Sequence, residues 1–264
     1  MARSVISCAL IFIAGCALAQ TAPSKGGPHA AEQAASLNAI REYALSYSRR
    51  LPDFTCTQKT RQTIVVHTET LNEFKEFDCG TKQNTWFAKP AIALAEGAGL
   101  PAPGAATDRL MGSSWRGEFG KVLDIVFDPE TGADLRWDRV ATLNGRRVSV
   151  VAFRVPQSRG YGLVESRRTI QVPFKGLVYA DYETGAVVRI EMKCIDIPGD
   201  SEYKGADLTL EYSPAHVGGG EFMLPSRYLA RFRMGRGEVT SEAEYTAWRR
   251  FSADTAIRFG DDEP

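Results

Sequence analysis

The chain has 264 residues, of which 44% are hydrophobic and 24% are charged, close to the composition of ordinary globular proteins. Its 32 basic and 32 acidic residues cancel, so it carries no formal net charge at pH 7. A neutral chain offers no electrostatic reason to bind nucleic acid or an anionic membrane surface. The length suits one large all-β domain better than two small ones.

Residues 1–19 have the three parts of a signal peptide: a basic start, an apolar run and the small-residue cleavage site Ala17-Leu18-Ala19. The run is shorter than the ~20 residues that span a bilayer, and no later segment is apolar enough to be a transmembrane span. Residues 13–16 also match a lipobox, which would leave Cys16 as a lipidated N-terminus. We therefore expect a periplasmic or secreted protein, or an outer-membrane lipoprotein if Cys16 is lipidated.

Residues 20–31 are rich in Ala, Gly and Pro, which predicts a flexible tether before a single domain over residues 32–260. Apolar residues then recur at helical spacing, which predicts an amphipathic helix packed against the rest of the domain. They are Leu37, Ile40, Ala44, Tyr47 and Leu51. Arg49 and Arg50 make the last turn basic, and Pro52 ends the helix.

Two segments rich in Thr, Val, Ile and Phe, residues 55–66 and 70–79, predict a β-hairpin. We place the centre of its turn between His67 and Thr68. This placement fixes the register of the two strands, because each residue then lies opposite the one equally far from the turn.

In that register Cys56 lies directly opposite Cys79. Directly opposed Cβ atoms are about 4.5–5.5 Å apart, and less in a non-hydrogen-bonded pair, which is the pair that suits a disulfide. Three pairings of the cysteines after the signal peptide are possible, and only this one fits the hairpin. We therefore expect a Cys56–Cys79 disulfide, with Cys194 left as a buried free thiol.

Residues 89–118 are dominated by Ala, Gly and Pro, which predicts a long loop or lid within the domain. Five apolar residues that follow fall on one helical face and predict a second, short helix. They are Phe119, Val122, Leu123, Val126 and Phe127. Ser113 or Ser114 is a suitable N-cap, and Asp128-Pro129 ends the helix.

After Gly132, short alternating segments separated by turn signals predict a large antiparallel sheet. Asn144-Gly145 is the strongest two-residue hairpin signal in the chain, and Glu183-Thr184-Gly185 marks another turn. A sheet of this length must curl, sandwich or close on itself. The predicted fold class is mainly β (α+β): a curved antiparallel sheet or half-barrel covered by one or two helices.

The sequence contains no catalytic or metal-binding motif. Its three histidines share no metal-ligand spacing, and no nucleophile elbow occurs. Acid pairs such as Asp181 with Glu183, or Asp196 with Asp200, could hydrolyse glycosides at a suitable separation. Turn and surface roles are commoner for such acids, so we expect no enzymatic activity, no cofactor and no metal, and a hydrolase is the weakest hypothesis.

Eight aromatic residues lie on predicted strands or near the loop and could line a hollow for an apolar ligand. They are Trp86, Trp115, Phe119, Trp137, Tyr179, Tyr228, Phe232 and Trp248. An ordinary aromatic core is the alternative role for each of them. Arg227, Arg231 and Arg233 alternate with apolar residues and indicate a solvated outer face.

Several segments resemble known bacterial families. GLVYADYETGAVVRIEM and FMLPSRYLARFRM are similar to the Asp-x-x-Thr-Gly turn and the following Leu-Pro strand of the LolA/RseB-like group. An uncharacterised family of bacterial secreted proteins is resembled more closely, in LPDFTCTQKTR, GEFGKVLDIVFDPETGADLRW, LNGRRVSVVAFRVP, GLVYADYETG and WRRFSADTAIRF. The LolA/RseB-like group consists of envelope proteins whose half-barrel sheet holds lipoprotein acyl chains in its concave face. That resemblance carries no lipid-contacting residue over to a position in this chain.

Two hypotheses about function follow. The first is a non-enzymatic periplasmic binding or carrier module for an apolar ligand, such as a lipid or the acyl chain of a lipoprotein, with the loop over residues 89–118 as its lid. The alternative is an envelope scaffold or signalling module that binds a protein partner through a sheet edge or the lid. The expected partners are thus an apolar small molecule, a lipoprotein or another envelope protein, and no nucleic acid.

Overall fold

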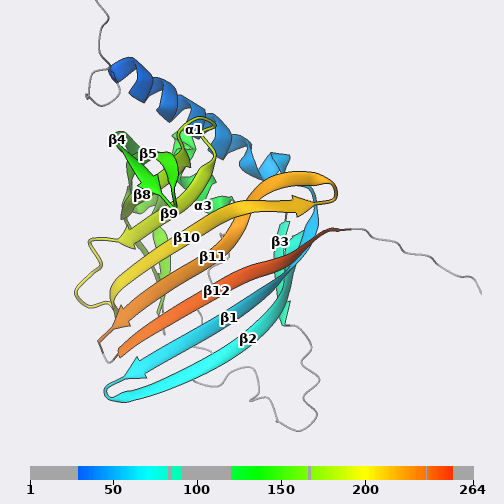
Figure 1. Ribbon diagram of the computed structural model, residues 1–264. Coiled ribbons are helices and arrows are strands. Elements are labelled where there is room, and N and C mark those ends of the chain that lie inside the picture. Colours follow the sequence, from blue (N-terminus) through cyan, green and yellow to red (C-terminus); the bar gives the residue numbers. More distant parts are fainter. Residues whose placement is uncertain (1–28, 83–84, 91–119, 166–167, 236, 252–264) are drawn as a thin grey trace, which may run out of the picture.

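The computed structural model describes residues 29–82, 85–90, 120–165, 168–235 and 237–251 (Figure 1). The strands are β1 (Phe54–Val66), β2 (Glu69–Lys82), β3 (Thr85–Pro90), β4 (Asp134–Leu143), β5 (Arg146–Val155), β6 (Tyr161–Val164), β7 (Thr169–Val172), β8 (Phe174–Asp181), β9 (Val187–Cys194), β10 (Tyr203–Val217), β11 (Gly220–Met234) and β12 (Gly237–Arg250). The helices are α1 (Ala30–Arg50) and α3 (Lys121–Phe127), with 3-10 turns η1 (Pro129–Thr131) and η2 (Gln157–Arg159). None of these helices is long and apolar enough to cross a membrane.

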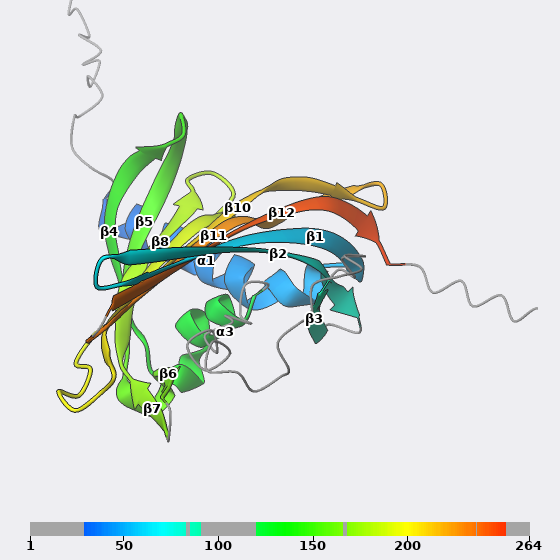
Figure 2. The same ribbon diagram turned by 90° about the horizontal axis from the view of Figure 1, so that it is seen from below.

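One antiparallel sheet of ten strands dominates the fold, in the order β3-β2-β1-β12-β11-β10-β9-β8-β5-β4. β6 and β7 form a separate two-stranded sheet. The large sheet is curved, and α1 and α3 lie on its concave side (Figure 2). The predicted fold class, a curved antiparallel sheet covered by helices, is therefore confirmed. The sequence did not predict that β1 pairs with β12, which joins the first hairpin to the last strand.

The first hairpin has the predicted register. Val66 pairs with Glu69 across the turn, where His67 has a positive φ of 55°. Cys56 pairs with Cys79, and the two form a disulfide with their Cα atoms 4.8 Å apart. Cys194 is a buried free cysteine, and burial, aided by Asp207, raises the pKa of its thiol to about 12. This thiol therefore stays protonated and unreactive at neutral pH.

The helix α1 begins at Ala30, two residues before the predicted start of the domain at residue 32. Its first turn is held by Glu32, whose carboxylate accepts a hydrogen bond from the backbone N–H of His29 at 3.1 Å. This hydrogen bond satisfies the backbone N–H of His29, which would be exposed to solvent in a flexible tether. The helix ends at Arg50 before Pro52, as predicted, and buries Ile40, Ala44 and Tyr47 against the sheet.

The second predicted helix is α3. Gly120 is the N-cap, with a φ of 116°, and a Cβ there would lie 2.2 Å from Ser48 Oγ of α1. Glycine thus allows α3 to approach α1 closely. Val122, Leu123, Val126 and Phe127 are buried, which is the predicted apolar face without Phe119.

Several predictions fall outside the described residues. These are the signal peptide, Cys16, residues 20–28 of the tether, residues 91–118 of the loop, the serine caps Ser113 and Ser114, Trp115, Phe119 and residues 252–260 of the domain. The loop was predicted to begin at Lys89, but Lys89 and Pro90 belong to β3, where they pair with Asp78 and Phe77. Ladder pairing with β2 therefore overrides the turn propensity of this proline.

Candidate functional site

The two faces of the large sheet differ in chemistry. The concave face carries the main hydrophobic core, which includes residues of α1, α3, eight strands of the large sheet and both strands of the small sheet. The convex face carries cross-strand ion pairs, for example Arg233 with Asp207 at 2.9 Å and Arg231 with Glu238 at 3.2 Å. A site for an apolar ligand would therefore lie on the concave face.

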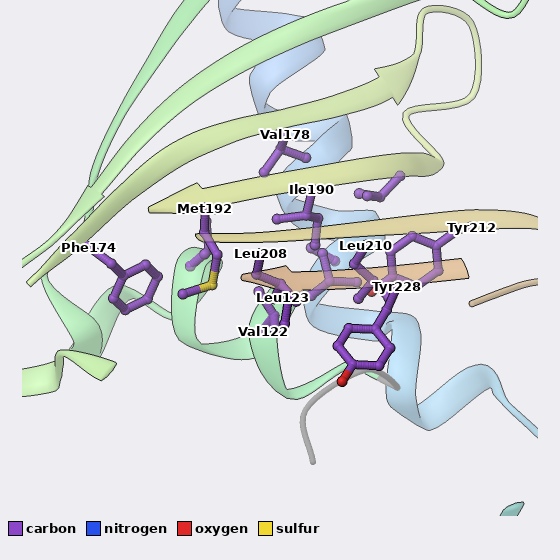
Figure 3. Close-up of a cluster of buried hydrophobic side chains, with 14 of the residues drawn as sticks. Val122, Leu123, Phe174, Val178, Ile190, Met192, Leu208, Leu210, Tyr212 and Tyr228 are labelled. Atoms are coloured by element: carbon purple, nitrogen blue, oxygen red, sulfur yellow. The ribbon is translucent and has the colours of Figure 1, made fainter. Parts of the chain in front are cut away.

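The helices fill much of this face. In Figure 3, Ile190, Met192 and Leu208 extend from β9 and β10 toward Val122 and Leu123 of α3. Tyr47 of α1 donates a hydrogen bond from its hydroxyl to the backbone oxygen of Met223 at 2.8 Å. In the region that the helices cover, the apolar face is thus a packed core.

A cavity of about 490 Å³ lies where β1 and β11 end and β12 begins. Its lining consists of Ile64, Val65, Val66, Ser201, Glu202, Lys204, Met234, Gly235, Gly237, Glu238 and Val239. Ile64 pairs with Val239, which pairs with Phe232 of the core, so these side chains share the concave face. The cavity is thus a continuation of the core surface beyond its packed part.

Polar groups stand at one side of the cavity. They come from residues 201–204, which precede β10 and enter it. Lys204 Nζ donates hydrogen bonds to the backbone oxygens of Gly199 and Ser201, both at 2.9 Å. On the opposite side Val66 is 39% exposed and Leu71, across the hairpin, is 52% exposed. An apolar surface therefore leads out of the cavity along the hairpin.

The loop beside the cavity is held by a buried carboxylate. The Glu165 side chain is 5% exposed and accepts hydrogen bonds from Ser201 Oγ at 2.6 Å, the backbone N–H of Glu202 at 3.0 Å and Arg168 Nε at 2.8 Å. The hydroxyl of Ser201, followed by the guanidinium of Arg168, lowers the pKa of Glu165 from its ordinary 4.5. These bonds attach the β6–β7 hairpin to the loop that lines the cavity.

We expect this carboxylate to make stability depend on pH in the acid range. Because the folded-state pKa of Glu165 is lowered, its contribution is complete above its unfolded value of about 4.5 and is lost as the pH falls through the folded-state pKa. Urea unfolding of the wild type and of Glu165→Gln at a series of pH values measures the contribution. The two should differ near neutrality and converge in acid, whereas a pH-independent difference would contradict the assignment.

Three of the eight aromatic candidates belong to or adjoin the packed core. Tyr228 is buried and its hydroxyl donates to Ser241 Oγ at 2.8 Å, and Phe232 packs edge-on against Tyr203 with ring centroids 6.0 Å apart. Trp248 is half-buried, edge-on to Phe54 at 5.3 Å. Tyr228 and Phe232 thus belong to the buried core, and Trp248 packs against it.

The other candidates do not gather with them. Trp137 pairs with the buried Val151 and shares its face, with its Nε1 buried and without a hydrogen-bond partner among the described residues. Tyr179 pairs with Val150 on the opposite face and donates its hydroxyl to Glu191 at 3.2 Å. Trp86 occupies a β3 position paired with Thr81, and Trp115 and Phe119 lie outside the described residues.

The acid pairs have structural surroundings. Asp181 Oδ1 accepts hydrogen bonds from the backbone N–H groups of Glu183 and Thr184 and so closes the β8–β9 turn. Asp196 pairs with Arg154 at 3.1 Å, and Asp200 pairs with Arg168 at 2.8 Å. In the described part of the chain, no three His, Cys, Asp or Glu side chains are grouped as metal ligands would be.

The aliphatic residues of the cavity, Ile64, Val66, Met234 and Val239, were not among the predicted site residues. A signal for them was present, because Ile64-Val65-Val66 is an unbroken apolar run beside a hairpin turn, where strand alternation would place a polar residue. Exposed apolar residues that cluster at the end of a strand indicate a binding surface.

Comparisons with known proteins give remote structural likenesses. The sequence matches no family model and no curated protein. A LolA superfamily protein of Nitrosomonas europaea is similar over 81% of this chain and 93% of its own, with 12% identity and a TM-score of 0.43. An outer membrane lipoprotein-sorting protein domain of Vibrio parahaemolyticus is similar over 81% and 92%, with 13% identity and a TM-score of 0.46.

A DUF1329 family protein of Desulfovibrio piger is similar over 84% of this chain and 95% of its own, with 10% identity and a TM-score of 0.39.

Proposed function

We propose that this protein is a non-enzymatic binding or carrier module that holds an apolar ligand, such as the acyl chain of a lipid or lipoprotein, against the concave face of its sheet. The observation that supports this most directly is the cavity of about 490 Å³ beside Ile64, Val66, Met234 and Val239. Its volume falls in the range of ~300–1,000 Å³ typical of small-molecule sites.

The lining suits an amphiphile. The aliphatic side chains would gain ~25 cal/mol for each Å² of apolar surface that the ligand removes from water. Lys204, Glu202 and Ser201 stand at the side of the cavity, where a polar head group could remain hydrated. The exposed Val66 and Leu71 would extend the contact along a ligand longer than the cavity.

We further propose that the mature chain works in the periplasm or is secreted, and is anchored to the outer membrane if Cys16 is lipidated. The basic and apolar start of the sequence supports export. The Cys56–Cys79 disulfide supports it independently, because disulfides persist in oxidising compartments.

A charge in the cavity should abolish most of the binding. Titration of the purified protein with cis-parinaric acid, a fatty acid that fluoresces when sheltered from water, measures the affinity directly. For Val66→Arg we expect the affinity to fall by about tenfold or more, because the new guanidinium must lose water where the acyl chain of the ligand would contact it. Val66 is 39% exposed, so the variant should fold.

Val164→Arg is the matched control, since Val164 is 54% exposed on β6 and does not line the cavity. It should bind the probe as the wild type does, and both variants should unfold at the same temperature as the wild type. Failure of the wild type to bind the probe, or equal losses in the two variants, would remove the support for the cavity as the site. Organic extraction of protein purified from its native cells should yield lipid.

Partner binding remains a second candidate because of one residue. Phe74 is 74% exposed on the convex face of the β1–β2 hairpin, where its neighbours are polar. If the wild type binds no apolar probe, while site-specific cross-linking in cells captures one defined envelope protein and Phe74→Ser abolishes the cross-link, the scaffold hypothesis is favoured instead.

A further inference from the structure

A second hollow, of about 590 Å³, lies on the convex face of the sheet over β4, β5, β8, β9 and β10. It is lined by Arg136, Ala152, Phe153, Arg154, Lys175, Gly176, Leu177, Glu191, Met192, Lys193, Asp207, Leu208 and Thr209. Four of these residues are basic and two are acidic, so the lining carries an excess of two positive charges. A neutral chain thus concentrates positive charge at one place.

Both acidic residues of the lining already have partners. Asp207 is paired with Arg233 at 2.9 Å. Glu191 is paired with Arg189 at 3.5 Å and accepts a hydrogen bond from the Tyr179 hydroxyl at 3.2 Å. These carboxylates are therefore engaged with groups outside the hollow.

The lysines of the hollow are in the reverse situation. Lys175 of β8 pairs in register with Lys193 of β9 on one side and with Arg154 of β5 on the other. Within the described residues, neither lysine forms an ion pair. Like charges directly opposite each other on a sheet destabilise it, so folding alone gives no reason for this row.

The rest of the convex face shows how the sheet otherwise arranges its charges. Arg61 and Arg227 both pair with Glu242, which lies on the strand between them. Lys59 faces Glu76 across the first hairpin with their charged atoms 4.0 Å apart. Basic residues there lie opposite acidic ones. Lys193 also has an acidic residue opposite it, Asp207 of β10, but Asp207 is ion-paired with Arg233. Arg154, Lys175 and Lys193 therefore form three successive basic positions without an acidic residue between them.

We propose that this hollow is a binding site for a ligand that carries at least two negative charges, of the phosphate class. Lys175 and Lys193 would each donate to it as point charges, and Arg154, whose guanidinium now reaches Asp196 at 3.1 Å, would present its planar donors beside them. The hydroxyl of Thr209 and the half-buried Leu177 and Ala152 form the floor. The bound anion would relieve the repulsion within the row.

This site does not depend on the proposed apolar site. Directly paired residues share a face, and Lys175, Leu177 and Glu191 lie on the convex side of strands whose Val178, Ile190 and Met192 point into the core. The two sites therefore occupy opposite faces of the sheet. Either can fail its test without affecting the other.

Isothermal titration of the full mature chain with pyrophosphate tests the proposal. The wild type should bind, with an affinity that falls as sodium chloride is added. In Lys175→Gln/Lys193→Gln the affinity should fall by about tenfold or more, because each substitution removes a charge-assisted hydrogen bond. Lys59→Gln, which removes a lysine paired with a carboxylate on the same face, should bind as the wild type does.

Thermal unfolding gives a second readout that separates binding from misfolding. Without pyrophosphate the double variant should unfold at the same temperature as the wild type or higher, since two positive charges that face each other across β8 and β9 have been removed. With pyrophosphate the unfolding temperature of the wild type should rise and that of the double variant should not. No binding by the wild type, or an equal loss in Lys59→Gln, would overturn the proposal.

Vesicles of phosphatidylglycerol in phosphatidylcholine identify the source of the phosphate. Sedimentation of the wild type with such vesicles, reversed by pyrophosphate and lost in the double variant, would place the phosphate on a lipid head group. Pyrophosphate binding without sedimentation would place it on a free ligand. Both results support the site, and sedimentation that is equal in the double variant contradicts it.

Discussion

Replacing both Cys56 and Cys79 with alanine is expected to lower the free energy of unfolding by about 3 kcal/mol, because the disulfide closes a loop with a sequence separation of 23 in the unfolded chain. Alanine is the suitable replacement, since both sites are buried and serine would add an unpaired hydroxyl. Urea unfolding under non-oxidising and oxidising conditions measures the effect.

Two comparisons separate the loss of the cross-link from the loss of sulfur. The wild type in dithiothreitol should approach the stability of the double variant, whereas the double variant should not respond to the reductant. Cys194→Ala removes a buried thiol without a cross-link, so its stability should still fall when reductant is added. A reductant-insensitive wild type would show that the bond contributes nothing to stability.

The position of the disulfide also predicts what it leaves intact. It joins β1 to β2 at the end of the hairpin far from the turn, whereas the cavity beside Val66 lies at the turn end. We therefore expect the double variant to bind the apolar probe with unchanged affinity wherever it remains folded. The disulfide would then stabilise the β1–β2 hairpin, which carries part of the cavity lining, without contacting the ligand.

The features that the sequence predicted well are local. The register of the first hairpin follows from counting away from its turn, and the Asn144-Gly145 turn follows from two residues that adopt positive φ, 50° and 78°. α1 ends before Pro52 and α3 ends before Pro129, because proline has no backbone N–H to donate and its ring clashes with the preceding turn of a helix. Each of these signals lies within a few residues of the feature that it specifies.

The features that the sequence did not predict depend on distant pairings. β1 lies beside β12 although they are almost the whole domain apart in the chain, and no local pattern states which strands become neighbours. The cavity is created by that pairing, because it brings Ile64 against Val239. The aromatic residues were conspicuous in the sequence, but burial of large rings serves the core as readily as a ligand.

The net charge of the chain gave no indication of the basic hollow on the convex face. A balance of 32 basic and 32 acidic residues is compatible with a face on which charges alternate and with a row of like charges. Only the β8–β9 register brings Lys175 opposite Lys193. Summed charge describes the field far from a protein, whereas recognition depends on the arrangement of charges within a few ångströms.

Leu123→Ala should lower the free energy of unfolding by about 2–5 kcal/mol, the usual cost of truncating a fully buried leucine. Leu123 has no exposed surface and lies against the sheet with Val122 in Figure 3. α3 has seven residues, too few for a helix that is stable by itself, so its burial holds it in place. Alanine favours helix formation, which means that the loss would measure packing and not helix propensity.

Ile125→Ala is the control within the same helix, because Ile125 is only partly buried where it packs on the core. Urea unfolding should show a clearly smaller loss for Ile125→Ala than for Leu123→Ala. Equal losses would mean that α3 does not bury the face described here. A loss of probe binding in folded Leu123→Ala would show that α3 belongs to the ligand site.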